Sequence, residues 1–260
     1  MDVYSSILFF VSISMMSRCD AENICSPNPN DSATIPSSCS SESPQSFVKR
    51  YAKCSLSPEC GEGPYFVEED LIRENIIEDR EGIPLSLQFN MIDYRTCEPI
   101  PNAKFYLWQP DYAGIYSGFM DKPPIRRERM IPRDPRRFLR GTQISDSNGT
   151  VNFETLFPGH YRGRTPHIHF RIHLDDNVAH IGQVFFDEKI ISQINSIPPY
   201  NQVKSRRMKN EEDGEFSYFN GEKSIIDLKP ISATASMEQG FTGIMNVVID
   251  PFHQSRLMWA

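Results

Sequence analysis

Residues 138–170 read FLRGTQISDSNGTVNFETLFPGHYRGRTPHIHF, and this stretch carries the clearest signals for both fold and chemistry. Its first half holds the turn Asp146–Gly149 between two runs rich in β-forming residues, at 138–145 and 150–156. Asn-Gly sequences favour tight turns between antiparallel strands, so this half predicts a β-hairpin. From Pro158 onward, a phenol, two guanidinium groups and two spaced imidazoles follow one another closely.

The second half indicates a metal site. His167 and His169 are two residues apart, and in an extended strand such residues point to the same face, about 7 Å apart along the backbone. Both imidazoles can therefore bind one ion. Tyr161 lies upstream of Gly163 and Pro166, which allow the chain to bend back toward that ion. Alternating histidines also occur on ordinary half-exposed strands, so the spacing leaves a structural role open.

Other segments extend the β pattern. Apolar residues alternate with polar ones from residue 84 until the turn at 95–99, which is typical of a half-buried strand. Further strands are predicted at 103–109, 165–174, 181–186 and 241–249. A helix is predicted after Asp187 as N-cap, with isoleucines on one face, and it ends before Pro198. Many short strands and few short helices predict an all-β sandwich rather than a parallel α/β sheet.

The N-terminal region differs from the rest. Residues 7–16 are apolar but too few to span a bilayer, so we predict a cleaved signal peptide over 1–21 and a secreted protein. The Ser/Pro/Asn-rich residues that follow predict an irregular, disulfide-stapled arm over 22–80, ahead of a β-sandwich catalytic domain over 81–255. The net charge of -7 argues against nucleic acid as a partner, and no membrane partner is expected.

All six cysteines fall in the first hundred residues, away from the His-x-His pair, at positions 19, 25, 39, 54, 60 and 97. They are interpreted as staples formed in an oxidising compartment. We predict that Cys54 bridges Cys97, which would join the arm to the end of the first core strand.

Several phrases in order along the chain resemble the intradiol ring-cleavage dioxygenases. Besides 138–170, they are CSLSPECGEGPYF (54–66), GIPLSLQFNMIDYRTCEPIPNAKFYLWQPDYAGIYSGF (82–119) and GQVFF (182–186). The resemblance implies a β-sandwich fold and one non-haem Fe(III) per chain, held by Tyr116, Tyr161, His167 and His169. Phenolates are hard anionic donors that suit ferric iron.

The resemblance also implies an activity. Such enzymes use O2 to cleave a catechol between its two hydroxyl-bearing carbons, which gives a cis,cis-muconate. Tyr161 would take part in catalysis by helping to take up a substrate proton, and Arg164 and Gln183 would orient the activated ring. Bacterial relatives dimerise through a helical N-terminal region that the arm replaces here, so a monomer is expected.

Simpler interpretations exist for each residue. Tyr116 could be a packed aromatic, with Tyr112 as a competing ligand; Arg164 could form a surface salt bridge, and Gln183 a strand-end hydrogen bond. Among the other histidines, His173 is expected to be structural and His160 to line the pocket mouth. Trp108 is expected to serve packing.

Two other functions were weighed. A cupin-type dioxygenase also uses His-x-His, but it needs a Glu soon afterwards, and residues 170–174 contain none. A secreted β-sandwich binding protein that has lost its iron is the alternative from a different class. The segment 119–137 carries a local charge of +4 and is a candidate lid that attracts anionic catechols, or else a solvated loop.

Overall fold

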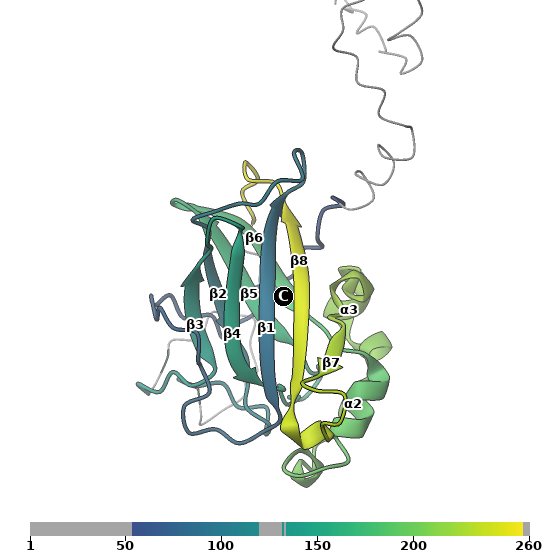
Figure 1. Ribbon diagram of the computed structural model, residues 1–260. Helices are drawn as coiled ribbons and strands as arrows, with labels where there is room; N and C mark the ends of the chain where they lie inside the picture. Colours follow the sequence, from purple (N-terminus) through teal and green to yellow (C-terminus); the bar gives the residue numbers. More distant parts are fainter. Residues whose placement is uncertain (1–53, 120–131, 133, 257–260) are drawn as a thin grey trace, which may run out of the picture. The chain divides into compact units, whose positions relative to one another are not determined.

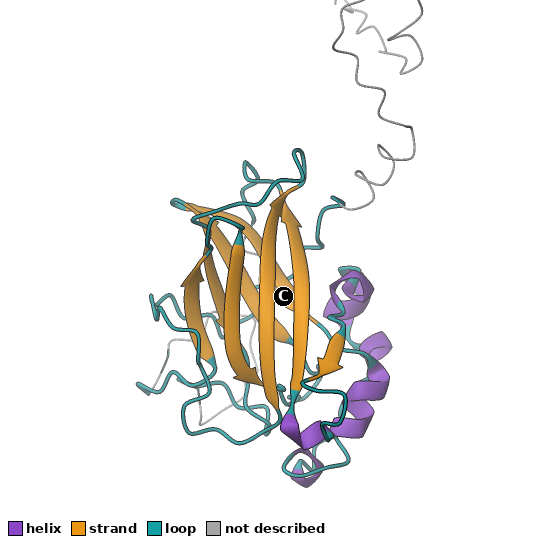
Figure 2. Cartoon of the chain, in the orientation of Figure 1, coloured by secondary structure: helices purple, strands orange, loops and turns teal. Residues whose placement is uncertain are grey.

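The computed structural model describes residues 54–119, 132 and 134–256. Two four-stranded sheets lie face to face (Figure 1), and helix is limited to short segments at one side (Figure 2). The first sheet has the order β4 (Thr150–Leu156), β1 (Pro84–Asp93), β8 (Phe241–Ile249), β7 (Leu228–Pro230). The second has the order β3 (Arg140–Ile144), β2 (Lys104–Trp108), β5 (Ile168–Leu174), β6 (Asn177–Val184). The predicted all-β sandwich with few short helices is confirmed.

The main core fills the space between the sheets. The apolar residues that alternate along β1 all point inward and are at most 1% exposed, namely Leu85, Leu87, Phe89 and Met91. Phe89 of β1 meets Phe105 of β2 with ring centroids 4.7 Å apart, so the two sheets contact directly through aromatic rings. Each such side chain contributes roughly 1.5–3 kcal/mol by leaving water.

The turn at Asp146–Gly149 is present, but the predicted hairpin is wrong. The Gly149 N–H donates to the Asp146 carbonyl (3.0 Å), which closes the turn. The flanking strands nevertheless join different sheets, because β3 pairs with β2 and β4 pairs with β1. The Met91 N–H donates to the Gly149 carbonyl (2.8 Å), which attaches the end of the turn to β1. The turn therefore carries the chain from one sheet to the other.

The helical segments lie beside β7 (Figure 1). Helix α2 (Glu188–Ile194) begins at the predicted N-cap Asp187, whose carboxylate accepts the Lys189 N–H at 2.8 Å. Ile191 and Ile194 of α2 are buried, and the helix ends before Pro198 as predicted. The other α-helix within the described residues is α3 (Gly214–Tyr218), and 3-10 turns occupy Tyr200–Gln202, Asn210–Glu212, Gly221–Ser224 and Met237–Gln239.

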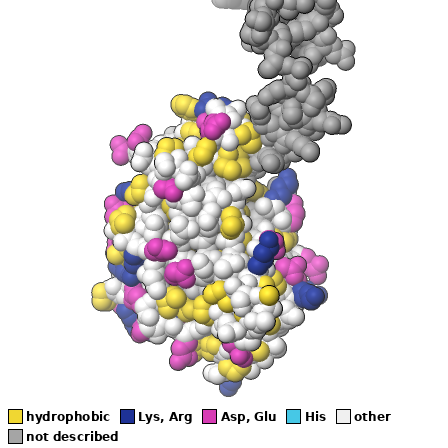
Figure 3. Space-filling model, viewed as in Figure 1, with side chains coloured by type: hydrophobic (Ala, Val, Ile, Leu, Met, Phe, Trp, Pro, Cys, Tyr) yellow, Lys and Arg dark blue, Asp and Glu magenta, His cyan; other side chains and the backbone are white. Residues whose placement is uncertain are grey.

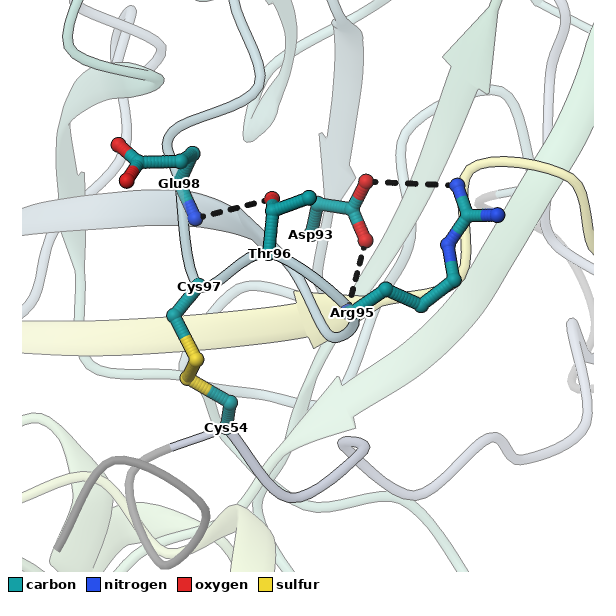
Figure 4. Close-up of a disulfide and its surroundings, with 6 residues drawn as sticks. All are labelled: Cys54, Asp93, Arg95, Thr96, Cys97 and Glu98. Atoms are coloured by element: carbon teal, nitrogen blue, oxygen red, sulfur yellow. Dashed lines mark hydrogen bonds and ion pairs between the residues drawn. A yellow bond between two sulfur atoms is a disulfide. The ribbon is translucent and has the colours of Figure 1, made fainter. Parts of the chain in front are cut away.

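Residues 54–80 contain no strand and are tied to the sandwich at several points. The disulfide between Cys54 and Cys97 confirms the predicted pair and joins this segment to the turn after β1 (Figure 4). Further along, isolated bridges link Ile72 to Thr142 and Asn75 to Glu154. Cys60 is buried and not disulfide-bonded. The predicted signal peptide, the first part of the arm and cysteines 19, 25 and 39 lie outside the described residues.

The two sheets present different outer faces. The face seen in Figure 3 is largely uncharged across its middle, where Ser86, Gln88 and Asn90 of β1 lie between Asn152 of β4 and Asn246 of β8. Among the residues that the structure describes, no helix is both long and apolar enough to cross a membrane. The outer face of the second sheet carries the candidate site.

Candidate active site

Strand β5 divides its side chains between the core and the candidate site. Ile168, Phe170 and Ile172 belong to the main core between the sheets. His169 points to the opposite face of the sheet, as strand geometry requires of alternate residues. There it stacks in parallel on Trp108 of β2, with ring centroids 5.1 Å apart and an interplanar angle of 6°. Trp108 therefore packs as predicted, and the residue that it packs against is a candidate ligand.

The four candidate metal ligands lie together on this outer face. Their rings form a closed circuit, because each ring neighbours the next: Tyr116 to Tyr161 at 5.9 Å, Tyr161 to His167 at 5.6 Å, His167 to His169 at 4.7 Å, and His169 to Tyr116 at 6.3 Å. Tyr112, the competitor, packs against the main core and Tyr200 instead. The geometry therefore favours Tyr116 over Tyr112.

The donor atoms of the two histidines fit a shared metal ion. His167 Nδ1 lies 2.7 Å from the Thr165 carbonyl oxygen, which can only accept, so Nδ1 carries the proton and Nε2 has a free lone pair. The two Nε2 atoms are 3.0 Å apart. Two ligands bound at about 2.1 Å and at right angles on one ion would be separated by about 3.0 Å. Burial holds the pKa of both imidazoles well below the ordinary value, so both are neutral ligands at neutral pH.

The Tyr116 phenol also fits a metal site. It is 1% exposed, and its hydroxyl has no hydrogen-bond partner among the described residues. Burial raises the pKa of this phenol well above its usual value, so a phenolate here requires a cation beside it. A buried phenol without a partner, facing two neutral imidazoles, is a donor set suited to ferric iron.

Arg164 lies directly against Tyr161. One terminal nitrogen of its guanidinium donates to the Tyr161 hydroxyl (3.2 Å), and the other donates to the Gln183 side-chain oxygen. Gln183 in turn donates to the Gly61 carbonyl (3.1 Å). Burial raises the pKa of Tyr161, and the charge of Arg164 partly offsets that effect. Arg164 therefore contacts both of the other residues expected to act in catalysis.

Asp213 is a site residue that sequence reasoning missed. Its carboxylate is fully buried and accepts from Arg164 Nε at 2.9 and 3.0 Å and from the Thr165 N–H at 2.8 Å. It also caps α3 by accepting the Glu215 N–H at 2.9 Å. Asp213 thus fixes the orientation of Arg164 and ties helix α3 to the site. In the sequence, an aspartate before a short helix is typical of an ordinary N-cap, so its contact with Arg164 could not be predicted.

The segment 61–66 forms one wall of the site. Tyr65 stacks on Tyr116 with centroids 4.0 Å apart and meets Tyr161 edge-on at 5.8 Å. Gly63 has a φ of +70°, and a Cβ there would lie 3.3 Å from His169 Cε1, so this wall touches a candidate ligand. Sequence reasoning included this segment in the resemblance but assigned Tyr65 no role.

A cavity of about 200 Å³ opens beside the rings and is lined by Tyr65, Gly114, Tyr116, His160, Tyr161 and Arg162, among others. His160 lines it as predicted, and its Nε2 donates to the Ser205 carbonyl oxygen, 3.0 Å away. This contact holds the loop around Ser205 at the cavity. Both candidate tyrosine ligands therefore border the cavity.

The remaining histidines lie outside the circuit of rings. His173, as expected, takes a structural position: it packs at 5.0 Å from the Tyr106 ring, and burial lowers its pKa to about 4. His180 stacks on Phe170, and His253 pairs with Glu59 at 2.9 Å. None of the three approaches the candidate ligands.

Most of the basic segment at 119–137 lies outside the described residues, which omit 120–131 and 133. Two of its arginines are described and are paired. Arg136 bonds Asp134 at 3.0 Å, and Arg137 bonds Glu69 at 2.6 Å. The proposed lid role stays a prediction.

Comparisons with known proteins agree with this fold. A family model described as Dioxygenase matches residues 58–218. The intradiol ring-cleavage dioxygenase from Tetranychus urticae is 66% identical, with a TM-score of 0.76, and the match covers 80% of this chain and 100% of that one. A search of curated protein sequences found no match.

Two bacterial structures share the fold at lower identity. The dioxygenase domain of a carbohydrate-binding fusion from a cellulolytic Streptomyces is 22% identical, with a TM-score of 0.53, covering 75% of this chain and 99% of that one. Catechol 1,2-dioxygenase from an Acinetobacter strain is 17% identical, with a TM-score of 0.52, covering 79% and 67%.

The β-sandwich and the family match define a class of dioxygenases that act on small aromatic molecules with O2. The chain belongs to the intradiol ring-cleavage dioxygenase family.

Proposed function

We propose that this chain is a non-haem Fe(III)-dependent dioxygenase that cleaves catechols between the two hydroxyl-bearing carbons. The observation that carries the proposal is the contact between the buried Tyr116, the partly buried Tyr161 and two neutral histidines, whose Nε2 atoms lie 3.0 Å apart. Tyr116, Tyr161, His167 and His169 would hold one ferric ion per chain. Bound iron would supply a Lewis acid that makes the catechol ring reactive toward O2.

The residues around Tyr161 fit a role in proton transfer. Tyr161 borders the cavity, and its hydroxyl oxygen accepts a hydrogen bond from Arg164 (3.2 Å), which favours the phenolate form. In that form the same oxygen can accept a proton from an incoming catechol hydroxyl. Gln183 limits the movement of Arg164 from the other side. The paired guanidinium and amide would then orient the charge that develops on the ring.

The alternative of a binding protein without iron gains no support from any observation. Its sandwich would not need a buried Tyr116 hydroxyl that lacks a partner, because such a group costs about 1–3 kcal/mol when left unsatisfied. A metal ligand role removes that cost.

The identity of the ring bond that is cleaved tests this proposal directly. Extradiol enzymes use Fe(II) with two histidines and one carboxylate. Among the described residues, no group of three or more His, Cys, Asp and Glu side chains can hold a metal ion, so a carboxylate ligand is not at hand. Purified, iron-loaded protein should consume O2 with catechol and yield cis,cis-muconate, with both oxygen atoms of O2 incorporated.

Oxygen uptake and product identification by mass spectrometry with labelled O2 would measure this. Tyr161→Phe should slow turnover, because the proton acceptor is lost. A yellow semialdehyde product, or activity that requires added Fe(II) and a reductant, would contradict the proposal. A panel of plain, alkylated, carboxylated and polyphenolic catechols would then rank the substrates.

We also propose that the chain is secreted and folds in an oxidising compartment. The Cys54–Cys97 disulfide supports this, because such bonds persist mainly outside reducing compartments. Expression in a secreting eukaryotic host should release protein whose N-terminus lies near residues 20–22. Peptide mapping without reduction should recover the Cys54–Cys97 peptide, and a reduced digest is the control. Retention inside the cell with both cysteines as free thiols would reject the proposal.

A further inference from the structure

Arg140 of β3 is a buried arginine whose hydrogen-bond partners are all neutral. It is 5% exposed. Its Nε donates to the Ser117 hydroxyl (2.9 Å), and its two terminal nitrogens donate to the Ser117 carbonyl (3.0 Å) and the Tyr65 carbonyl (2.7 Å). Within the described part of the chain, no carboxylate forms an ion pair with it. The buried arginines Arg164 and Arg171 differ, since Asp213 and Glu62 neutralise them.

An unpaired buried charge is costly. Moving a charged group out of water costs several kcal/mol even after the protein relaxes, and neutral hydrogen bonds satisfy its donors without cancelling its charge. Burial lowers the pKa of Arg140 to about 9, so the group is still a cation at neutral pH. A fold that keeps such a cation needs a nearby negative charge to offset the cost.

The strongest candidate for that charge is Tyr116, and the carboxylates of Glu69 and Asp134 also act on Arg140 without forming an ion pair with it in the described part of the chain. The Arg140 guanidinium carbon lies 6.0 Å from the Tyr116 ring centroid. Arg140 also binds both polar groups of Ser117, the next residue in the chain, and the carbonyl of Tyr65, which stacks on the Tyr116 ring. The Arg140 guanidinium therefore connects Ser117, which follows Tyr116 in the chain, with Tyr65, which stacks on the Tyr116 ring.

We propose that Arg140 is a positioning residue that fixes Tyr116 and stabilises the negative charge that Tyr116 carries as an iron ligand. The inference rests on the proposed function, and it adds a residue outside the set expected to bind iron or substrate. Arg140 touches neither the cavity nor the other three candidate ligands in any contact found in the described residues.

The charge of Arg140 should be visible in the colour of the iron-loaded protein. Tyrosinate bound to Fe(III) absorbs visible light as an electron moves from the phenolate to the metal. A cation beside the phenolate ring lowers the energy of its electrons, so removing the cation should move the band to longer wavelength. One charge about 6 Å away, at an effective dielectric constant of about 20, implies a shift on the order of 10 nm.

The test compares visible spectra and iron content of wild type, Arg140→Gln and Arg140→Lys after loading with Fe(III). R140Q should still bind iron, because its four ligands remain, but its band should lie at longer wavelength. R140K keeps the charge and loses the forked hydrogen bonds, so its band should return toward the wild-type position while its melting temperature stays lowered. A structural role alone would lower the melting temperature of both variants without moving either band.

A second variant covers the case in which R140Q does not fold. Ser117→Asp would supply the missing carboxylate beside Arg140 and should also move the band to longer wavelength. The matched control is the double variant Glu188→Gln/Arg207→Gln, which removes a largely buried arginine together with its own carboxylate and should leave the band in place. A wild-type band that neither R140Q nor S117D shifts overturns this inference alone. A wild type without any such band overturns the proposed function as well.

Discussion

Alanine in place of His167 or His169 should abolish iron binding and turnover together. Each change removes one donor from a set of four, and the cavity that remains is lined by few other groups that could replace it. Loss of even a supporting contact typically costs 10–100-fold in metal affinity, so loss of a ligand should cost at least about 100-fold. Iron per chain by metal analysis, and O2 uptake with catechol, would measure the two effects.

His173→Ala is the matched control for this pair. His173 is buried on the same strand and lies outside the circuit of rings, so its replacement should lower stability while iron content stays near one per chain. If H167A or H169A retained full iron and full turnover, the assignment of that histidine as a ligand would be wrong. If H173A lost iron to the same degree, the effect would reflect general unfolding of β5.

Asp213→Asn should lower turnover about 100-fold while iron content changes little. The substitution keeps the shape of the side chain but removes the negative charge that orients Arg164, and it leaves a guanidinium that is 14% exposed without its ion-pair partner. A displacement of about 1 Å at such a contact can cost about 100-fold in rate, and breaking a buried pair costs about 3–5 kcal/mol. Steady-state kinetics, metal analysis and thermal unfolding would separate these effects.

Glu212→Gln removes the neighbouring carboxylate and serves as the control. Glu212 lies on the surface and bonds Arg206 at 2.6 Å, outside the site, so this variant should behave like wild type. Equal kinetics for D213N and E212Q would show that Asp213 has no positioning role. A rate loss in D213N accompanied by loss of iron would mean that Asp213 supports the metal ligands rather than Arg164.

The strands of the fold could be predicted from the sequence because their patterns are local. The alternation along β1 and the cap of α2 are each set by neighbouring residues, and both appear where they were predicted. The pairing of β3 and β4 could not be predicted in this way. The turn between them has the sequence of a hairpin turn, but β4 pairs along its length with β1, which is far away in the sequence and belongs to the other sheet.

The candidate site shows the same division. His167, His169, Tyr161 and Arg164 fall within one short stretch, and the resemblance supplied Tyr116 and Gln183 at a distance. The positions of Asp213 and Arg140 in the site could not be predicted, because each residue binds a partner far away in the sequence, at 49 and 23 residues respectively. A buried charge is invisible in sequence, where aspartate and arginine resemble ordinary surface residues.

The division of β5 between core and site has a mechanical consequence. Ile168, between the two histidines, is fully buried among the hydrocarbon side chains of the sandwich. Protein interiors are close-packed, so a change of even one methylene there is transmitted to its neighbours. The spacing of the two imidazoles is thus held by packing on the opposite side of the sheet. If the protein binds iron as proposed, heat that loosens the sandwich should bleach its colour in the same transition, because the two histidines flank a core residue.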